Sequence, residues 1–144
     1  MKRGVRRGTA FLLLSFAAFP ADTQELVGYS GEKLYQRFCA ACHGTAGQGD
    51  GPVASSLVVL VPDLTRLYQR HGETFPAAQV REIIDGRSVV VAHGTRYMPV
   101  WGYEFWVEEG ADVVAEQETR TIVDNLVEYI RSLQYAADLL EPAS

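Results

Sequence analysis

Two cysteines three positions apart, followed at once by a histidine, constrain this chain more than any other feature. They form the segment Cys39-Ala40-Ala41-Cys42-His43, a spacing that predicts c-type haem attachment. The two thiols can add to the two vinyl groups of a haem. Because the vinyls lie on one edge of the ring, both sulfurs must leave the same helical turn. The histidine that follows can then bind the iron through an imidazole nitrogen.

The same cysteine pair has two other chemical uses, a redox disulfide and a zinc site. A redox disulfide of this spacing usually lies in a thioredoxin-like βαβ setting, and the sequence shows no such setting. A closed zinc site takes four ligands, so two of His43, His71 and His93 would have to join the two cysteines of the chain. Haem attachment is therefore the preferred interpretation.

The N-terminus has the layout of a secretory signal peptide. A basic start at residues 2–7 precedes an uncharged apolar run at residues 10–18. Small residues favour cleavage after Ala17, and cleavage after Ala21 is the alternative. The run is short for a transmembrane helix, which needs about 20 residues, although an uncleaved anchor is the competing interpretation. We therefore expect a periplasmic protein without stable membrane insertion.

Cleavage would make the chain more acidic. The whole chain has a net charge of −5, from 13 basic and 18 acidic side chains. Removing residues 1–17 leaves nine basic side chains and all 18 acidic ones, a net charge of −9. Such a protein is a poor ligand for nucleic acid or anionic membranes. The charge would steer it toward a basic patch on a partner, or serve solubility alone.

Apolar residues at helical spacing predict three helices, over residues 31–39, 74–85 and 119–134. The first follows Ser30, a helix-capping residue, and ends at the haem motif. The cysteines are therefore expected at the C-terminal end of a short amphipathic helix.

Four other segments give weaker signals. The glycine-rich residues 44–52 predict a turning loop whose backbone would pass close to a flat macrocycle. Residues 53–61 are apolar and could form a short strand, but we interpret them as a loop packed on the haem face. Residues 86–101 have an irregular pattern. Residues 104–118 contain six acidic and no basic side chains, which indicates a solvated face with Phe105 and Trp106 as its apolar anchors. An insertion or a docking surface is the alternative.

These features together resemble the class I monohaem cytochromes c, over roughly residues 31–133. The shared residues are Gly31, Leu34 and Tyr35 ahead of the haem motif, Met98-Pro99 after it, and Leu126, Tyr129 and Ile130 in the last helix. The resemblance implies an all-α cytochrome c fold, with short helices wrapped around one covalently bound haem. Its first and last helices cross at right angles, where Gly31 and Tyr35 would meet Leu126 and Tyr129.

The resemblance also implies the cofactor and its ligands. One haem c would be attached to Cys39 and Cys42, with His43 and Met98 as the axial ligands of its iron. Met98 is the only methionine of the mature chain, because the other is the first residue. His93 is the rival sixth ligand, and a site without a sixth protein ligand stays open.

The hydrogen bonds around the haem are assigned less closely. Pro52 or a nearby carbonyl could accept the ring N–H of His43, and His71 is expected at the surface. The candidate partners of a haem propionate are Arg66, Arg96, Tyr97 and Trp101.

An iron with two protein ligands has no open position for a substrate, so the resemblance implies single-electron transfer and no enzyme activity. We expect a periplasmic carrier whose partners are a dehydrogenase, a bc-type complex, an oxidase or a reductase. The alternatives are a haem subunit of a larger oxidoreductase complex and a haem sensor or enzyme with a displaceable sixth ligand. The expected organisation is a signal at 1–17, an irregular lead-in at 18–30, the cytochrome domain at 31–135 and a tail at 136–144.

Overall fold

The structure is a computed structural model, and it describes residues 25–87 and 97–138. Within these two ranges the chain forms helices and no strands, which confirms the all-α prediction. The predicted signal segment, His93, Arg96 and residues 139–144 lie outside the described residues. None of the helices in the described ranges combines the length and the apolar character needed to span a membrane.

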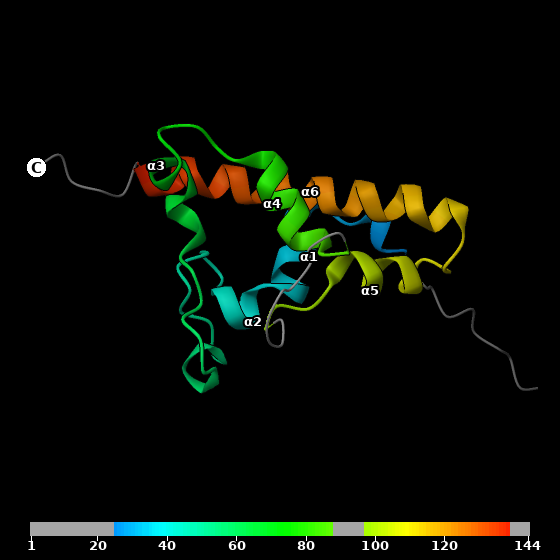
Figure 1. Cartoon of the computed structure of the whole chain (residues 1–144), viewed down its shortest axis with the longest axis horizontal. Coiled ribbons are helices and arrows are strands. Elements are labelled where there is room, and N and C mark those ends of the chain that lie inside the picture. The colour runs from blue at the N-terminus through cyan, green and yellow to red at the C-terminus, as the bar shows by residue number, and fades with distance from the viewer. Residues whose placement is uncertain (1–24, 88–96, 139–144) are drawn as a thin grey trace, which may run out of the picture.

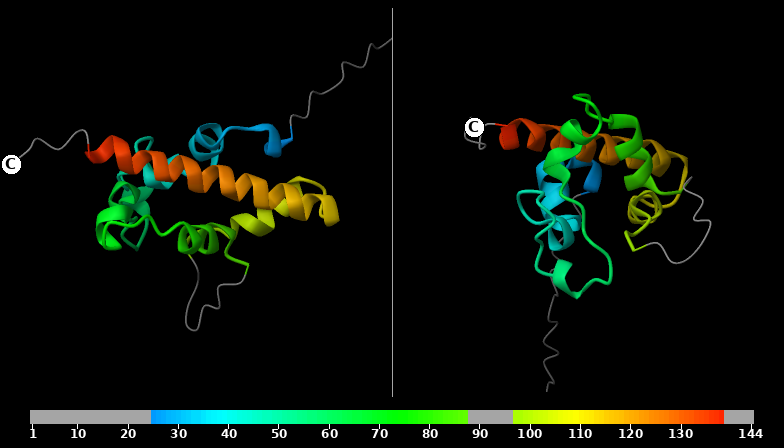
Figure 2. Two further views of the ribbon diagram at one scale, coloured as in Figure 1. Left: turned by 90° about the horizontal axis from the view of Figure 1, so that it is seen from above. Right: turned by 60° about the vertical axis from the view of Figure 1, so that its left-hand side comes forward.

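Nine short and long helices follow one another in these ranges. They are η1 (Leu26–Gly28), α1 (Gly31–Phe38), α2 (Ala40–His43), η2 (Ala54–Ser56), η3 (Leu64–Arg66), α3 (Leu67–Arg70), α4 (Ala77–Asp85), α5 (Trp101–Glu108) and α6 (Val113–Asp138), the η elements being 3₁₀-helices. Figure 1 shows α6 running along the domain, with the shorter helices gathered beside it. From above, η1 and α1 lie on one side of α6, and α4 lies on the other (Figure 2).

The contact between α1 and α6 depends on a glycine. An ideal Cβ at Gly31 would lie 2.8 Å from the carbonyl carbon of Asn125 and 2.9 Å from the Cβ of Tyr129. One turn further along α1, the rings of Tyr35 and Tyr129 lie 5.1 Å apart. The predicted meeting of Gly31 and Tyr35 with the last helix is therefore confirmed, because any side chain at Gly31 would force the helices apart.

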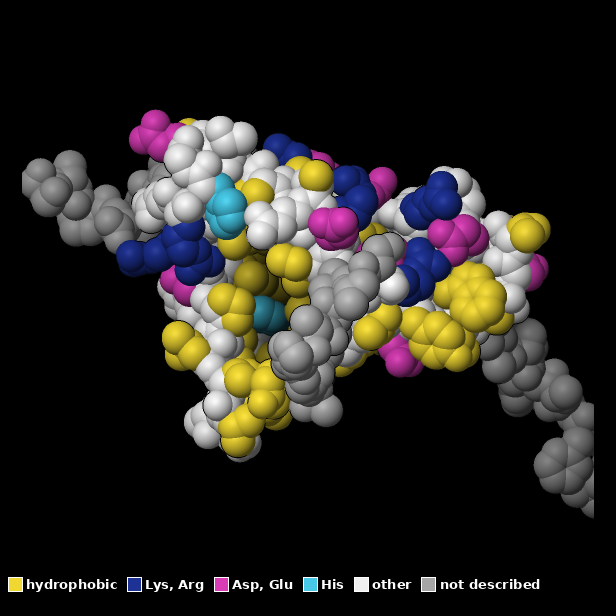
Figure 3. All heavy atoms as spheres, in the orientation of Figure 1, with side chains coloured by type: hydrophobic (Ala, Val, Ile, Leu, Met, Phe, Trp, Pro, Cys, Tyr) yellow, Lys and Arg dark blue, Asp and Glu magenta, His cyan; other side chains and the backbone are white. Residues whose placement is uncertain are grey.

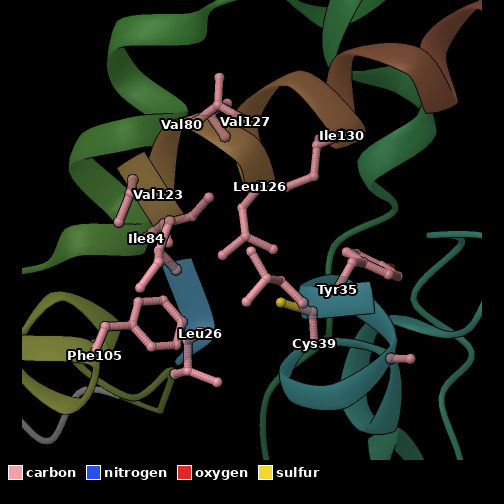
Figure 4. Packing of buried hydrophobic residues seen from close by; sticks show 13 residues of the cluster. Leu26, Tyr35, Cys39, Val80, Ile84, Phe105, Val123, Leu126, Val127 and Ile130 are labelled. Carbon is pink, nitrogen blue, oxygen red and sulfur yellow. The ribbon is translucent and has the colours of Figure 1, made fainter. Parts of the chain in front are cut away.

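The core is built on the apolar face of α6, whose buried residues recur at three- and four-residue spacing. Figure 4 shows Val80 and Ile84 of α4 against Val123 and Val127 of α6. The same cluster includes Leu26, so the folded part of the chain begins ahead of the first predicted helix. The expected irregular lead-in thus contains a short helix, η1, that is packed on the core.

Two helix starts differ from the prediction. The helix α4 begins at Ala77, after Pro76 as the cap residue, instead of at residue 74, and it ends as expected at Gly86, which has a left-handed φ of 69°. The last helix begins at Val113, six residues early. Its start is fixed by the Asp112 carboxylate, which accepts the N–H groups of Val114 and Ala115 at 2.8 and 2.9 Å.

The acidic residues 104–118 keep Phe105 as a buried apolar anchor, as predicted, but they are divided between two helices. They form most of α5 and the first part of α6, and both helices contribute to the core. Phe105 is 1% exposed and Ala115 is fully buried, whereas the acidic side chain of Glu104 is exposed. Phe105 and Ala115 thus cover the interior, whereas Val113 and Val114 are exposed. Among the acids, Glu109 is half-buried and its carboxylate accepts the Leu26 N–H at 2.7 Å.

Candidate haem site

An apolar cavity opens beside the Cys-x-x-Cys-His motif. Figure 3 shows it as a hollow walled by hydrophobic side chains, with a histidine at its floor. The described lining consists of Phe38, Cys39, Cys42, His43, Leu57, Val59, Leu60, Val61, Pro62, Tyr97, Met98, Pro99 and Trp101. The structure therefore brings all four predicted site residues to one cavity, together with the apolar loop that was expected to face the haem.

The two cysteines and the histidine belong to one short helix, α2, and to the residue that precedes it. Cys39 lies between α1 and α2, and Cys42 and His43 form the last turn of α2. Cys39 is 7% exposed. Burial raises the pKa of its thiol to about 12, and nearby Cys42 adds to the rise. A sulfur in this place is most stable without charge, which suits a thioether better than a thiolate.

The His43 ring is held by a main-chain oxygen. Its Nδ1 lies 3.3 Å from the carbonyl oxygen of Pro62, so with the proton on Nδ1 the ring donates to this carbonyl and leaves Nε2 as the ligand atom. Burial lowers the pKa of His43, and the bond to Pro62 opposes that shift. The predicted acceptor, Pro52, is exposed and lies elsewhere, so the named residue was wrong and the expectation of a nearby carbonyl was right.

The glycine-rich loop folds back on the open end of α2. Four consecutive carbonyls at this end accept hydrogen bonds from the loop or from α1. The pairs are Val53 N–H to Ala41 O (3.1 Å), Gly51 N–H to Cys42 O (3.1 Å), Gly49 N–H to His43 O (2.8 Å), and Tyr35 Oη–H to Gly44 O (2.8 Å). These bonds satisfy carbonyls that every helix end leaves without partners.

The loop glycines have a different neighbour from the macrocycle that was expected. An ideal Cβ at Gly51 would lie 2.6 Å from the carbonyl carbon and oxygen of Cys42. One at Gly49 would lie 2.6 Å from the Val61 oxygen. The described lining of the cavity includes neither residue. These glycines allow backbone to pack on backbone next to His43.

Met98 lines the cavity from a second segment of the chain, just ahead of α5. It is half-buried and packs against the core. The helix α5 that follows is held by aromatic contacts, with the Phe38 ring 5.5 Å from that of Trp101 and 5.3 Å from that of Phe105. It also lies close to α4, because a Cβ at Gly102 would meet the carboxylate of Asp85 at 2.6 Å.

The remaining candidates fall into two groups. Tyr97 and Trp101 line the cavity, whereas Arg66 is exposed and pairs with Asp63 at 3.4 Å. His71 is exposed, as predicted, and its Nδ1 lies 2.9 Å from the Leu67 oxygen.

The zinc alternative finds no support in the described residues. The one set of three or more groups there that could hold a metal ion is Glu25, Glu109 and Glu118. None of these three lines the cavity, and the set does not include His71 or the two cysteines.

Two contributors to the cavity were missed from the sequence. Phe38 was assigned only to a helix face, although its position next to Cys39 was a usable signal. The Pro62 carbonyl is a main-chain group, and nothing in the local pattern marks it. The fold of the chain brings both Phe38 and the Pro62 carbonyl to the cavity.

An all-α domain whose Cys-x-x-Cys-His motif and Met98 line one apolar cavity has the design of a class I c-type cytochrome. The comparison with family models agrees with this class. Residues 28–116 match the family described as "Cytochrome C oxidase, cbb3-type, subunit III". Since the match covers more than half of the chain, the chain belongs to this family of haem-binding electron-transfer domains. No curated protein and no solved structure was found to match it.

Proposed function

We propose that this protein transfers single electrons in the periplasm through one haem c. In this proposal the haem is attached covalently to Cys39 and Cys42 and is ligated by His43 and Met98. The observation that supports it most is the shared cavity. Met98 lies far from the motif in the sequence, yet it lines the same apolar cavity as the two cysteines and the histidine.

The residues of the cavity suit electron transfer better than bond chemistry. A haem in this place supplies an iron that changes oxidation state by one electron. The His43 imidazole and the Met98 thioether would both hold the iron, which would leave no place on it for a substrate. The thioether of Met98 and the apolar walls both disfavour the higher charge of the oxidised state, which raises the reduction potential.

The family suggests the kind of partner. Its description names an oxidase subunit, so a partner within an oxidase or another redox complex is the coarse expectation. A soluble carrier and a permanently bound subunit remain two forms of the same proposal. Gel filtration of a native periplasmic extract separates them, because the haem absorbance elutes at the size of the single domain in one case and with a larger complex in the other.

The proposal is tested on the full chain expressed with the c-type maturation machinery. Haem that stays on the chain in denaturing electrophoresis demonstrates covalent attachment, and a haem-to-protein ratio of one demonstrates a single site. A weak far-red band in the ferric spectrum reports a methionine ligand. Absence of that band would reject Met98 and favour His93, water or no ligand opposite His43. Ready binding of carbon monoxide by the reduced protein would favour an open sixth position. N-terminal sequencing and cell fractionation test the signal and the compartment.

A further inference from the structure

Gly49 makes two different contacts to the residues that hold the His43 ring. Its N–H donates to the His43 oxygen at 2.8 Å, which fixes the main chain of the ligand residue. Its other side lies against Val61 and Pro62, where an ideal Cβ would be 2.6 Å from the Val61 oxygen and 3.3 Å from the Pro62 oxygen. That Pro62 oxygen is the acceptor of the His43 ring. One glycine therefore lies between the ligand residue and the carbonyl that orients it.

The close approach is possible only without a side chain. Gly49 has a φ of 80°, a left-handed conformation that most residues adopt only with strain. Nearby, the Leu64 N–H donates to the Gly47 oxygen at 2.7 Å and ties the two segments together a second time. The Pro62 carbonyl therefore lies close to Gly49, and any Cβ at Gly49 would push the two apart.

The hydrogen bond between the His43 ring and the Pro62 oxygen is already long. At 3.3 Å between Nδ1 of His43 and the Pro62 oxygen, it lies just beyond the usual range for N–H···O bonds. A displacement of the carbonyl by a few tenths of an ångström would weaken it. A ring N–H with a carbonyl acceptor makes imidazole a stronger donor to a metal, and stronger donation favours the oxidised iron.

We propose that Gly49 is a positioning residue, which sets the reduction potential of the bound haem by holding the Pro62 carbonyl on the His43 ring. The inference depends on the proposed ligation by His43. It predicts that a side chain at Gly49 raises the potential, because the ring loses part of its acceptor and donates less strongly to the iron.

The test compares three variants of the haem-loaded full chain by spectroelectrochemical titration. Gly49→Ala adds both the Cβ and the backbone strain. Gly49→Asn adds the same Cβ contact with less strain, because asparagine tolerates the left-handed region, and it covers the case in which the alanine variant fails to fold. Gly72→Ala is the matched control, because its φ of 67° gives the same kind of backbone strain but no atom lies within 4 Å of its Cβ, and it does not line the cavity.

We expect both Gly49 variants to shift the equilibrium toward the reduced form by up to about tenfold, which is about 59 mV for a one-electron couple. Gly72→Ala should lose stability and keep the wild-type potential. Solvent exchange of the His43 Nδ1 proton, followed by NMR in the reduced state, should be faster in the Gly49 variants only. Unchanged potential and exchange in a folded Gly49 variant, or an equal shift in Gly72→Ala, would overturn the inference.

These outcomes are separate from those that test the proposed function. A wild-type spectrum without the methionine band rejects Met98 as ligand, while the Gly49 variants can still raise the potential through His43. A normal wild-type spectrum with no shift in the Gly49 variants rejects the positioning role and leaves the electron-transfer proposal intact.

Discussion

The two sides of the cavity are held by different kinds of contact. On the His43 side, main-chain hydrogen bonds join the end of α2 to the loop that follows it, and a carbonyl orients the ring. On the Met98 side, the described contacts are mainly apolar, with Met98 packed on the core and α5 held by stacked and tilted rings. The first side joins α2 to the loop that returns to it, and the second joins helices that lie far apart in the sequence.

This difference suggests how each side responds to change. Hydrogen bonds have narrow geometry, so the His43 side is expected to tolerate little displacement without a measurable effect on the ligand. Apolar packing is less directional, so the Met98 side depends on whether α4, α5 and α6 stay together. The two sides can be broken separately, because their contacts come from different elements.

The largest effect is expected when the haem can no longer be attached, because both sides of the cavity then lose the group between them. The double variant Cys39→Ala, Cys42→Ala removes both points of attachment, and a domain of this size depends on the haem to fill much of its interior. We expect no haem on the chain in denaturing electrophoresis and a loss of helical circular dichroism. Covalent haem in the double variant would show that the motif is not the attachment site.

The next largest effect is expected from variants that change only the Met98 side. Met98→Leu keeps an apolar side chain of similar size and removes the sulfur, and Met98→Ala removes both. We expect both variants to retain covalent haem, to lose the far-red ferric band, and to have a potential lower by on the order of 100 mV. If the leucine variant keeps the band and only the alanine variant loses it, Met98 acts through packing and not as a ligand.

The packing of α5 is tested by Gly102→Ala. The new Cβ would lie 2.6 Å from the Asp85 carboxylate and 2.8 Å from the Asp85 carbonyl oxygen, so α5 must move away from α4, at a cost of about 1–3 kcal/mol. Denaturant unfolding measures the cost. Gly28→Ala is the control, since no atom lies within 4 Å of its Cβ. Equal stability of the two variants would contradict the tight α4–α5 contact.

On the His43 side, Tyr35→Phe removes a single hydrogen bond and keeps the ring. The Tyr35 hydroxyl, whose pKa is raised mainly by burial, donates to the Gly44 oxygen at 2.8 Å. Its loss should cost about 1 kcal/mol in the free energy of unfolding. The exposed Tyr103 provides the control Tyr103→Phe, for which we expect no change. The Gly47 N–H also donates to the Gly44 oxygen, at 3.2 Å, and unchanged stability of Tyr35→Phe would show that this bond alone satisfies the carbonyl.

The smallest effect concerns pH and the ion pairs beside α5. Hydrogen bonds from Arg87 lower the pKa of Asp85, and Arg87 also reaches Glu116 on α6 at 2.6 Å. A carboxyl with a lowered pKa stabilises the fold above its ordinary pKa, and that stability is lost as the pH falls through the lowered value. We expect the melting temperature to fall in acid less steeply in Arg87→Gln than in the wild type. Parallel pH curves would assign the acid sensitivity to other carboxyls.

Much of the fold and site followed from local patterns in the sequence. The Cys-x-x-Cys-His spacing, the glycine at position 31 and the capping serine at position 30 each act within one or two helical turns, and the structure places them as expected. The Ser30 hydroxyl, for example, accepts the Lys33 N–H at 3.2 Å. Such features are readable because propensity, capping and periodicity depend on near neighbours in the chain.

The tertiary structure decided the features that depend on distant segments. The acidic residues led us to predict the start of the last helix too late, although Asp112 was a capping signal. The helix begins earlier because Ala115 and Thr119 are buried against other helices, which outweighs the local charge. The choice of Pro62 over Pro52 depends on how the loop returns to α2. A main-chain oxygen carries no sequence signature, so the residue that orients His43 became visible only when the chain was folded around it.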